Sequence, residues 1–176
     1  DLGSNEQRYL GLLAKVERLK AESEGAVTPQ FSDAVMKGVP GSVKEELESF
    51  KANANNLQSQ TLVLNQQLAQ REQEVSGLRT RLGDLNEVLR LSQQERDMIA
   101  PLVERGSAPK VELLQLERGI KERQTERNSV SASLTQAQSA VNEAKARIGE
   151  LESAAKAQAQ TELSATMIEM NSVKET

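Results

Sequence analysis

Residues 82–120 read LGDLNEVLRLSQQERDMIAPLVERGSAPKVELLQLERGI, and this segment determines an architecture that the rest of the chain extends. Up to the break at residues 106–109, apolar residues recur alternately every three and four positions, and the same recurrence resumes after it. A 3.5-residue period predicts a helix that packs along a partner helix. Because only four residues separate the two periodic stretches, each can be the partner of the other. The sequence therefore predicts an all-α fold, a long antiparallel coiled-coil hairpin that bends at the break.

The period continues far to either side of this segment. Between Leu47 and Val103 it passes through 17 positions without a slip, and 13 of them are apolar. Between Leu113 and Ala155 it passes through 13 positions, of which 11 are apolar. Rows of this length indicate a continuous seam along both helices.

The composition argues against a globular core and against catalysis. Aromatic residues make up 2% of the 176-residue chain, so we expect a thin helical seam in place of a core that buries several rings. Histidine and cysteine are absent, which removes the usual metal ligands and nucleophiles. We therefore expect no enzyme, no metal site and no cofactor. The net charge of −4 gives no reason to expect nucleic-acid binding.

Local signals divide the chain into five segments. They are an N-terminal helix (1–25), a loop (26–42), an ascending helix (43–105), a tip turn (106–108) and a descending helix (109–176). The first helix is expected to begin at Asn5 after a Ser4 cap, and to stop at Gly25. Ser42 is expected to cap the ascending helix. Pro109 suits the first turn of the descending one.

Two further signals shape the N-terminal helix and its surroundings. Tyr9, Leu12, Val16 and Leu19 form one apolar stripe on that helix, and a short helical turn is expected over residues 31–36 of the loop. After Ala155 the apolar residues change step. They then fall at Ala159, Leu163, Met167, Met170 and Val173. This change widens the apolar face, which predicts that the N-terminal helix folds back to form a three-helix base.

Charged residues in the seam predict the register of the hairpin. If the chain bends at about residue 107, residues that face each other have numbers summing to about 214. Arg71 then lies opposite Glu143, and Arg127 lies opposite Glu87. Since a half-buried guanidinium needs a partner, we expect these two pairs to fix the register.

Residues 101–118, PLVERGSAPKVELLQLER, resemble the hairpin tip of the haemolysin-D family, the periplasmic adaptor or membrane fusion proteins of type I secretion systems. Residues 18–22 followed by Gly25 fit the same family. The resemblance implies a periplasmic domain of a protein anchored in the inner membrane of a Gram-negative bacterium. Such adaptors bridge an ABC transporter to a TolC-like outer-membrane channel and assemble as a ring of six. We expect the chain to be a fragment of such a protein and, alone, to be a monomer or weak dimer.

The tip is the expected partner-binding site. Its residues are Leu102, Arg105, Gly106, Ser107, Pro109 and Lys110. Drug-efflux relatives carry an Arg-Leu-Ser pattern at their tips. Only its leucine, Leu102, is retained here, with Met98 at the arginine position and Pro109 at the serine position.

Two other functions remain open at this point. A coiled coil of this kind also suits a structural scaffold or spacer. A prefoldin-like holding chaperone would also use paired helices, but it would expose apolar helix ends beside the chain termini.

Overall fold

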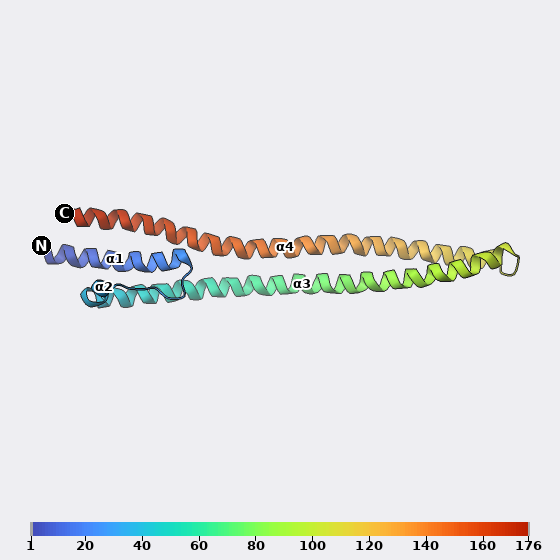
Figure 1. The fold of residues 1–176 in the computed structure, drawn as a ribbon, viewed down its shortest axis with the longest axis horizontal. Helices are drawn as coiled ribbons and strands as arrows, with labels where there is room; N and C mark the ends of the chain where they lie inside the picture. Colours follow the sequence, from blue (N-terminus) through green and yellow to red (C-terminus); the bar gives the residue numbers. More distant parts are fainter. Residues whose placement is uncertain (1, 176) are drawn as a thin grey trace. The chain divides into compact units, whose positions relative to one another are not determined.

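The computed structural model describes residues 2–175, which form four helices and no strand (Figure 1). The helices are α1 (Leu2–Glu24), α2 (Asp33–Gly38), α3 (Pro40–Glu104) and α4 (Lys110–Glu175). The predicted all-α fold with a long helical hairpin is confirmed. The chain divides into two compact units: a base unit of Asp1–Asn65 with Ala146–Thr176, and a tip unit of residues 66–145.

The tip unit is held together by the predicted seam. Its α3 and α4 segments face each other, and the Arg81 side chain of α3 forms an ion pair with Glu126 of α4. The buried apolar residues of this unit are Val75, Leu85, Leu89, Ile120, Val130 and Ala137. Every one of them occupies a predicted heptad position, because these are the positions that a 3.5-residue period turns toward a partner helix.

In the base unit, α1 packs against α4 on one side and against the segment from α2 to the start of α3 on the other. Val16 and Leu19 of α1 form one apolar cluster with Leu163 and Met170 of α4. Ala14 of α1 forms a second cluster, with Val35 and Val39. Leu19 is completely buried. The predicted third helix of the base therefore has an apolar contact on two sides.

The second of these contacts was missing from the sequence prediction, which gave α1 one stripe only. Leu10, Leu13 and Ala14 form the additional face, and it packs against the segment from Phe31 to Val43. The approach is close, since a Cβ atom at Gly38 would lie 2.5 Å from Leu10 Cδ1. Gly38 is thus the residue that lets α2 lie against α1.

Several predicted helix boundaries require correction. α1 begins at Leu2, so Ser4 lies inside the helix and does not cap it. α3 begins at Pro40, a residue suited to the first position of a helix, so Ser42 is not its N-cap either. The short helix in the loop covers Asp33–Gly38, two residues later than expected. Gly25 does end α1, with a left-handed φ of 71°.

The C-terminal part of α4 buries a threonine where the sequence predicted a methionine. Thr166 is 4% exposed, whereas Met167 is 43% exposed. The threonine hydroxyl donates a hydrogen bond of 2.8 Å to the Glu162 carbonyl, so its burial leaves no polar group unpaired. The face that packs on α1 therefore continues from Leu163 through Thr166 to Met170.

A buried arginine joins α1 to α3 in the base unit. Arg18 is 7% exposed, and its Nε donates to Glu46 Oε2 at 2.5 Å while its Nη1 donates to Glu22 at 3.0 Å. Burial lowers the pKa of Arg18, but the hydrogen bond to Glu46 and the two nearby carboxylates raise the pKa above its ordinary value. Asn53 of α3 also donates to Glu22, at 3.0 Å. These bonds fix how α1 lies along α3.

Candidate partner-binding tip

The turn between α3 and α4 is built by backbone hydrogen bonds around one glycine. Gly106 has a left-handed φ of 75°, which side chains with a Cβ adopt only at a cost. The Gly106 amide donates to the Val103 carbonyl at 3.0 Å, and the Ser107 amide donates to the Leu102 carbonyl at 2.8 Å. This is the Schellman arrangement, which satisfies carbonyls that the end of a helix leaves open.

The same turn fixes the neighbouring residues. The Pro101 carbonyl accepts from the Arg105 amide at 3.2 Å and from Arg105 Nε at 3.4 Å. On the other side, the Pro109 carbonyl accepts from the Glu112 amide at 3.2 Å, and α4 begins at Lys110. Backbone bonds on both sides of Gly106 therefore preorganise the tip.

All six residues predicted for the site are exposed at this turn. Leu102 is 37% exposed, a large value for a leucine in a helix that has a partner. Arg105 and Lys110 lie on opposite sides of the turn and are both exposed. The residues thus form one accessible surface, and their role in binding a partner remains a prediction.

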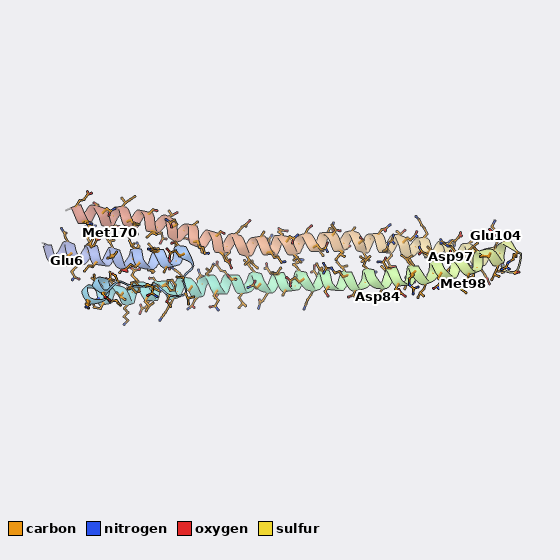
Figure 2. All side chains as sticks on the ribbon, viewed as in Figure 1. Glu6, Asp84, Asp97, Met98, Glu104 and Met170 are labelled. Carbon is orange, nitrogen blue, oxygen red and sulfur yellow. The ribbon has the colours of Figure 1, made fainter. Side chains whose placement is uncertain are left out.

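Three apolar residues that were not predicted from the sequence as part of the site extend this surface. Met98, Val111 and Leu114 are 69%, 61% and 51% exposed. Figure 2 labels Met98 near the turn-proximal end of α3. Each of the three lies outside the heptad seam, and that departure from the period is the signal that could have identified them. The tip unit therefore exposes more apolar surface than Leu102 alone provides.

The charges around the turn balance. Glu104 and Arg105 come before the turn, and Lys110 and Glu112 follow it. A neutral, partly apolar surface favours short-range packing over long-range attraction of a charged partner.

Three of the four residues predicted to set the register have partners in their own helices. Arg71 pairs with Glu74 at 3.5 Å in its own helix, and Glu87 pairs with Arg90 at 2.6 Å. Arg127 Nη2 donates to the Asn128 side chain at 3.2 Å. Arginines at the edge of a seam can turn out to water, where a partner three residues away is easier to reach than one on the facing helix. In the tip unit an ion pair joins Arg81 of α3 to Glu126 of α4, at 2.7 Å.

The groove between α3 and α4 shows which residues face each other in the tip unit. Glu72 and Ser76 of α3 line it together with Gln138 and Asn142 of α4. In the sequence, Arg71 precedes Glu72 and Glu143 follows Asn142, two of the residues that line this groove. Their facing position stays a prediction, although the ion pair first expected for Arg71 is formed with Glu74.

No helix within residues 2–175 combines the length and the apolar character that crossing a membrane requires.

Comparisons with known proteins place this geometry in a family. The model of the family described as AprE, long alpha-helical hairpin, matches residues 1–176. The soluble domain of LipC, a membrane fusion protein of a type I secretion system, has a similar crystal structure, with a TM-score of 0.85 at 21% sequence identity. That likeness covers 98% of this chain and 83% of the LipC chain, and it shows the fold. No match was found among curated proteins.

The resemblance to haemolysin-D adaptors that the tip sequence indicated is thereby confirmed. Because the family model covers every residue, this chain belongs to the AprE long alpha-helical hairpin family.

Proposed function

We propose that this chain is the helical hairpin of a periplasmic adaptor in a type I protein secretion system. In this role the adaptor bridges an inner-membrane ABC transporter to a TolC-like outer-membrane channel, and the hairpin tip contacts the channel. Membership of the AprE hairpin family and the LipC-like fold support the proposal. The tip sequence supports the contact with the channel.

One observation carries the choice of the tip. Within the tip unit, the apolar rows of α3 and α4 are buried against each other, as at Leu89 and Ile120. The turn instead leaves Leu102 exposed beside Arg105 and Lys110. An apolar anchor with charged residues around it is the usual composition of a small protein-binding site. We therefore assign Leu102 as the anchor.

The preorganised turn suits this task. Ordering a flexible loop on binding costs conformational entropy, whereas a loop already fixed by hydrogen bonds avoids most of that cost. The bonds to the Leu102 and Val103 carbonyls hold the turn before any partner arrives. Arg105 and Lys110 can then donate hydrogen bonds to carboxylate or carbonyl oxygens at the rim of the channel.

The proposal also places the hairpin in the periplasm of a Gram-negative cell, as part of an adaptor that assembles as a ring of six. The hairpin alone is expected to be a monomer or weak dimer, because it lacks the effective concentration that a membrane anchor would provide.

Secretion assays with surface variants test the proposal. In a cell that depends on this adaptor, Leu102→Asp and Arg105→Glu should each abolish secretion of the system's substrate. Circular dichroism should show unchanged helix content, since both side chains are exposed. Leu62→Asp is the matched control, because Leu62 is 58% exposed on α3 within the base unit. Normal secretion by both tip variants would favour the scaffold function and reject docking through the tip.

A further inference from the structure

The last turn of α3 contains a proline at a position where a helix normally has a hydrogen-bonded amide. Pro101 lies inside α3, which continues to Glu104. In the helical pattern the amide of residue 101 would donate to the carbonyl of Asp97, four residues earlier. Proline has no such amide and its ring crowds that carbonyl, so a proline inside a helix lowers the stability of the helix. The last turn is therefore joined to the preceding part of α3 by one hydrogen bond fewer than a regular helix would have.

Neither the end of the helix nor the packing of the hairpin requires this proline. Gly106, with its left-handed φ, ends α3, and the helix runs on from Pro101 before it reaches that turn. The Pro101 side chain is exposed, whereas the seam residues at this level, Ile99 and Val103, are partly buried. An alanine at position 101 would supply the missing amide without removing a buried contact. The reason for the proline therefore lies outside the stability of the hairpin.

Pro101 begins the turn of helix that carries the exposed residues of the tip. Its ring restricts φ to about −65°, so the backbone that leads to Leu102 has little freedom. The Pro101 carbonyl accepts the Arg105 amide at 3.2 Å and Arg105 Nε at 3.4 Å. The next carbonyl, that of Leu102, accepts the Ser107 amide at 2.8 Å. The turn that starts at Pro101 thus holds the Leu102 backbone and the Arg105 side chain together.

We propose that Pro101 is a positioning residue for the tip, because it determines the direction in which Leu102 and Arg105 face a partner. This inference rests on the proposed function, and it deepens the contact with a channel by adding a residue that acts through two others. A proline inside a helix bends the helix, and a fixed φ leaves the chain less conformational entropy to lose when the turn is held in place. With alanine at position 101 the last turn would continue the preceding helix, and Leu102 and Arg105 would leave the orientation that docking uses.

Pro101→Ala tests this role, because its effects on stability and on secretion should have opposite signs. Restoring the amide should raise the Tm of the chain by roughly 2–4 °C. In the parent cell, both secretion and the capture of the channel by a photoreactive residue at position 107 should fall roughly fivefold. A proline with a structural role alone would change the Tm and leave secretion as it was.

Gly77→Ala is the matched control for the gain in stability. Gly77 is an exposed residue of α3 in the tip unit, and a Cβ atom there would meet nothing within 4 Å. Alanine replaces a helix-weakening residue at this position too, so the Tm should rise while secretion stays at the level of the unaltered chain.

Pro101→Gly is a second variant that separates the fixed φ from the missing amide. Glycine restores the amide but releases φ, so Pro101→Gly should be less stable than Pro101→Ala. Secretion should nevertheless fall at least as far as in Pro101→Ala, because the last turn is then free to move. The loss of secretion would thus follow the loss of the ring and would not follow the change in stability.

A double-mutant cycle distinguishes positioning from a direct contact of the proline ring with the channel. Leu102→Ala is combined with Pro101→Ala, and secretion by the double variant is compared with secretion by each single variant. If Pro101 acts through Leu102, the double variant should lose less than the product of the two single losses, because the second change affects an interaction that is already impaired. Losses that multiply would contradict positioning.

Three further results would overturn the proposal. They are normal secretion by Pro101→Ala, a lower Tm for that variant, and an equal loss of secretion by Gly77→Ala. Leu102→Asp is the reference in every secretion assay. If secretion is lost with Leu102→Asp and kept with Pro101→Ala, docking through the tip stands and only the role of Pro101 is rejected. If both variants and Arg105→Glu secrete normally, docking through the tip is rejected as well.

Discussion

Arg81 of α3 and Glu126 of α4 are joined in the tip unit by an ion pair, with Nη2 and Oε1 2.7 Å apart. The Arg81 side chain is 60% exposed and that of Glu126 is 36% exposed. Arg123 lies 3.6 Å from the same glutamate, so Glu126 has a cationic partner on each helix. This pair links α3 to α4 within the tip unit.

The pair should be visible in the titration of Glu126. The hydrogen bond from Arg81 holds the pKa of Glu126 below its ordinary value of 4.5, with the charge of Arg81 and the nearby Arg123 adding to the effect. A carboxylate with a depressed pKa stabilises the fold above its unfolded-state pKa, and this contribution is lost as the pH falls through the lower, folded-state pKa. Arg81→Ala should therefore raise the Glu126 pKa toward 4.5 in an NMR titration. An unchanged pKa would contradict the pairing.

Removing Arg18 should destabilise the base unit. Arg18→Met leaves the partly buried Glu22 and Glu46 without their cation, so the free energy of unfolding should fall by about 2 kcal/mol or more. Urea unfolding followed by circular dichroism measures this difference. Arg71→Met is the control, because the Arg71–Glu74 pair is about half exposed. Its loss should lower the free energy of unfolding by less than about 1 kcal/mol. Equal effects from the two variants would show that burial of Arg18 contributes nothing.

Replacement by alanine should have opposite effects on stability at two glycines, Gly77 in α3 and Gly106 in the turn. Gly106 has a φ of 75°, so Gly106→Ala should lower the free energy of unfolding by about 1 kcal/mol. Gly77 lies inside α3, and a Cβ atom there would meet nothing within 4 Å. Gly77→Ala should therefore stabilise the chain by about 0.5–1 kcal/mol. Thermal unfolding of both variants decides the matter, and shifts of the same sign would refute this assignment of the turn.

Truncating a leucine in the seam should lower the free energy of unfolding more than truncating a leucine on the surface. Leu89 is 3% exposed, and Leu89→Ala should lower the free energy of unfolding by about 2–3 kcal/mol through lost burial and the cavity left behind. Leu91, two residues away, is 50% exposed. Leu91→Ala should change the free energy of unfolding by less than about 0.5 kcal/mol in dilute protein. Chemical unfolding distinguishes the two, and similar losses would contradict the placement of the seam.

The sequence predicted the hairpin because burial of residues such as Leu85 and Ile120 depends on a period that is visible in one chain. The contact between α1 and α2 could not be predicted from such a period. Leu10 and Ala14 gain their partners from a loop that has no periodicity, and the close approach at Gly38 is a property of the folded backbone.

Two smaller differences from the sequence predictions have equally physical causes. Hydropathy favoured Met167 over Thr166, but a threonine whose hydroxyl bonds to its own helix can be buried at little cost. The ion pairs of Arg71 and Glu87 depend on long side chains that reach several partners at similar energy, and near neighbours on one helix were preferred. At the tip, the six predicted residues share one exposed surface, but the apolar side chains of Met98 and Val111 beside it were recognised only from their exposure.

Site-specific cross-linking in the parent cell tests the proposed contact between the tip and an outer-membrane channel. A photoreactive residue replaces Ser107 at the turn, and a matched one replaces Val63, which is 52% exposed on α3 of the base unit. The probe at position 107 should capture an outer-membrane channel protein, and the probe at position 63 should not. Capture of the channel at both positions alike, or at position 63 only, would contradict it.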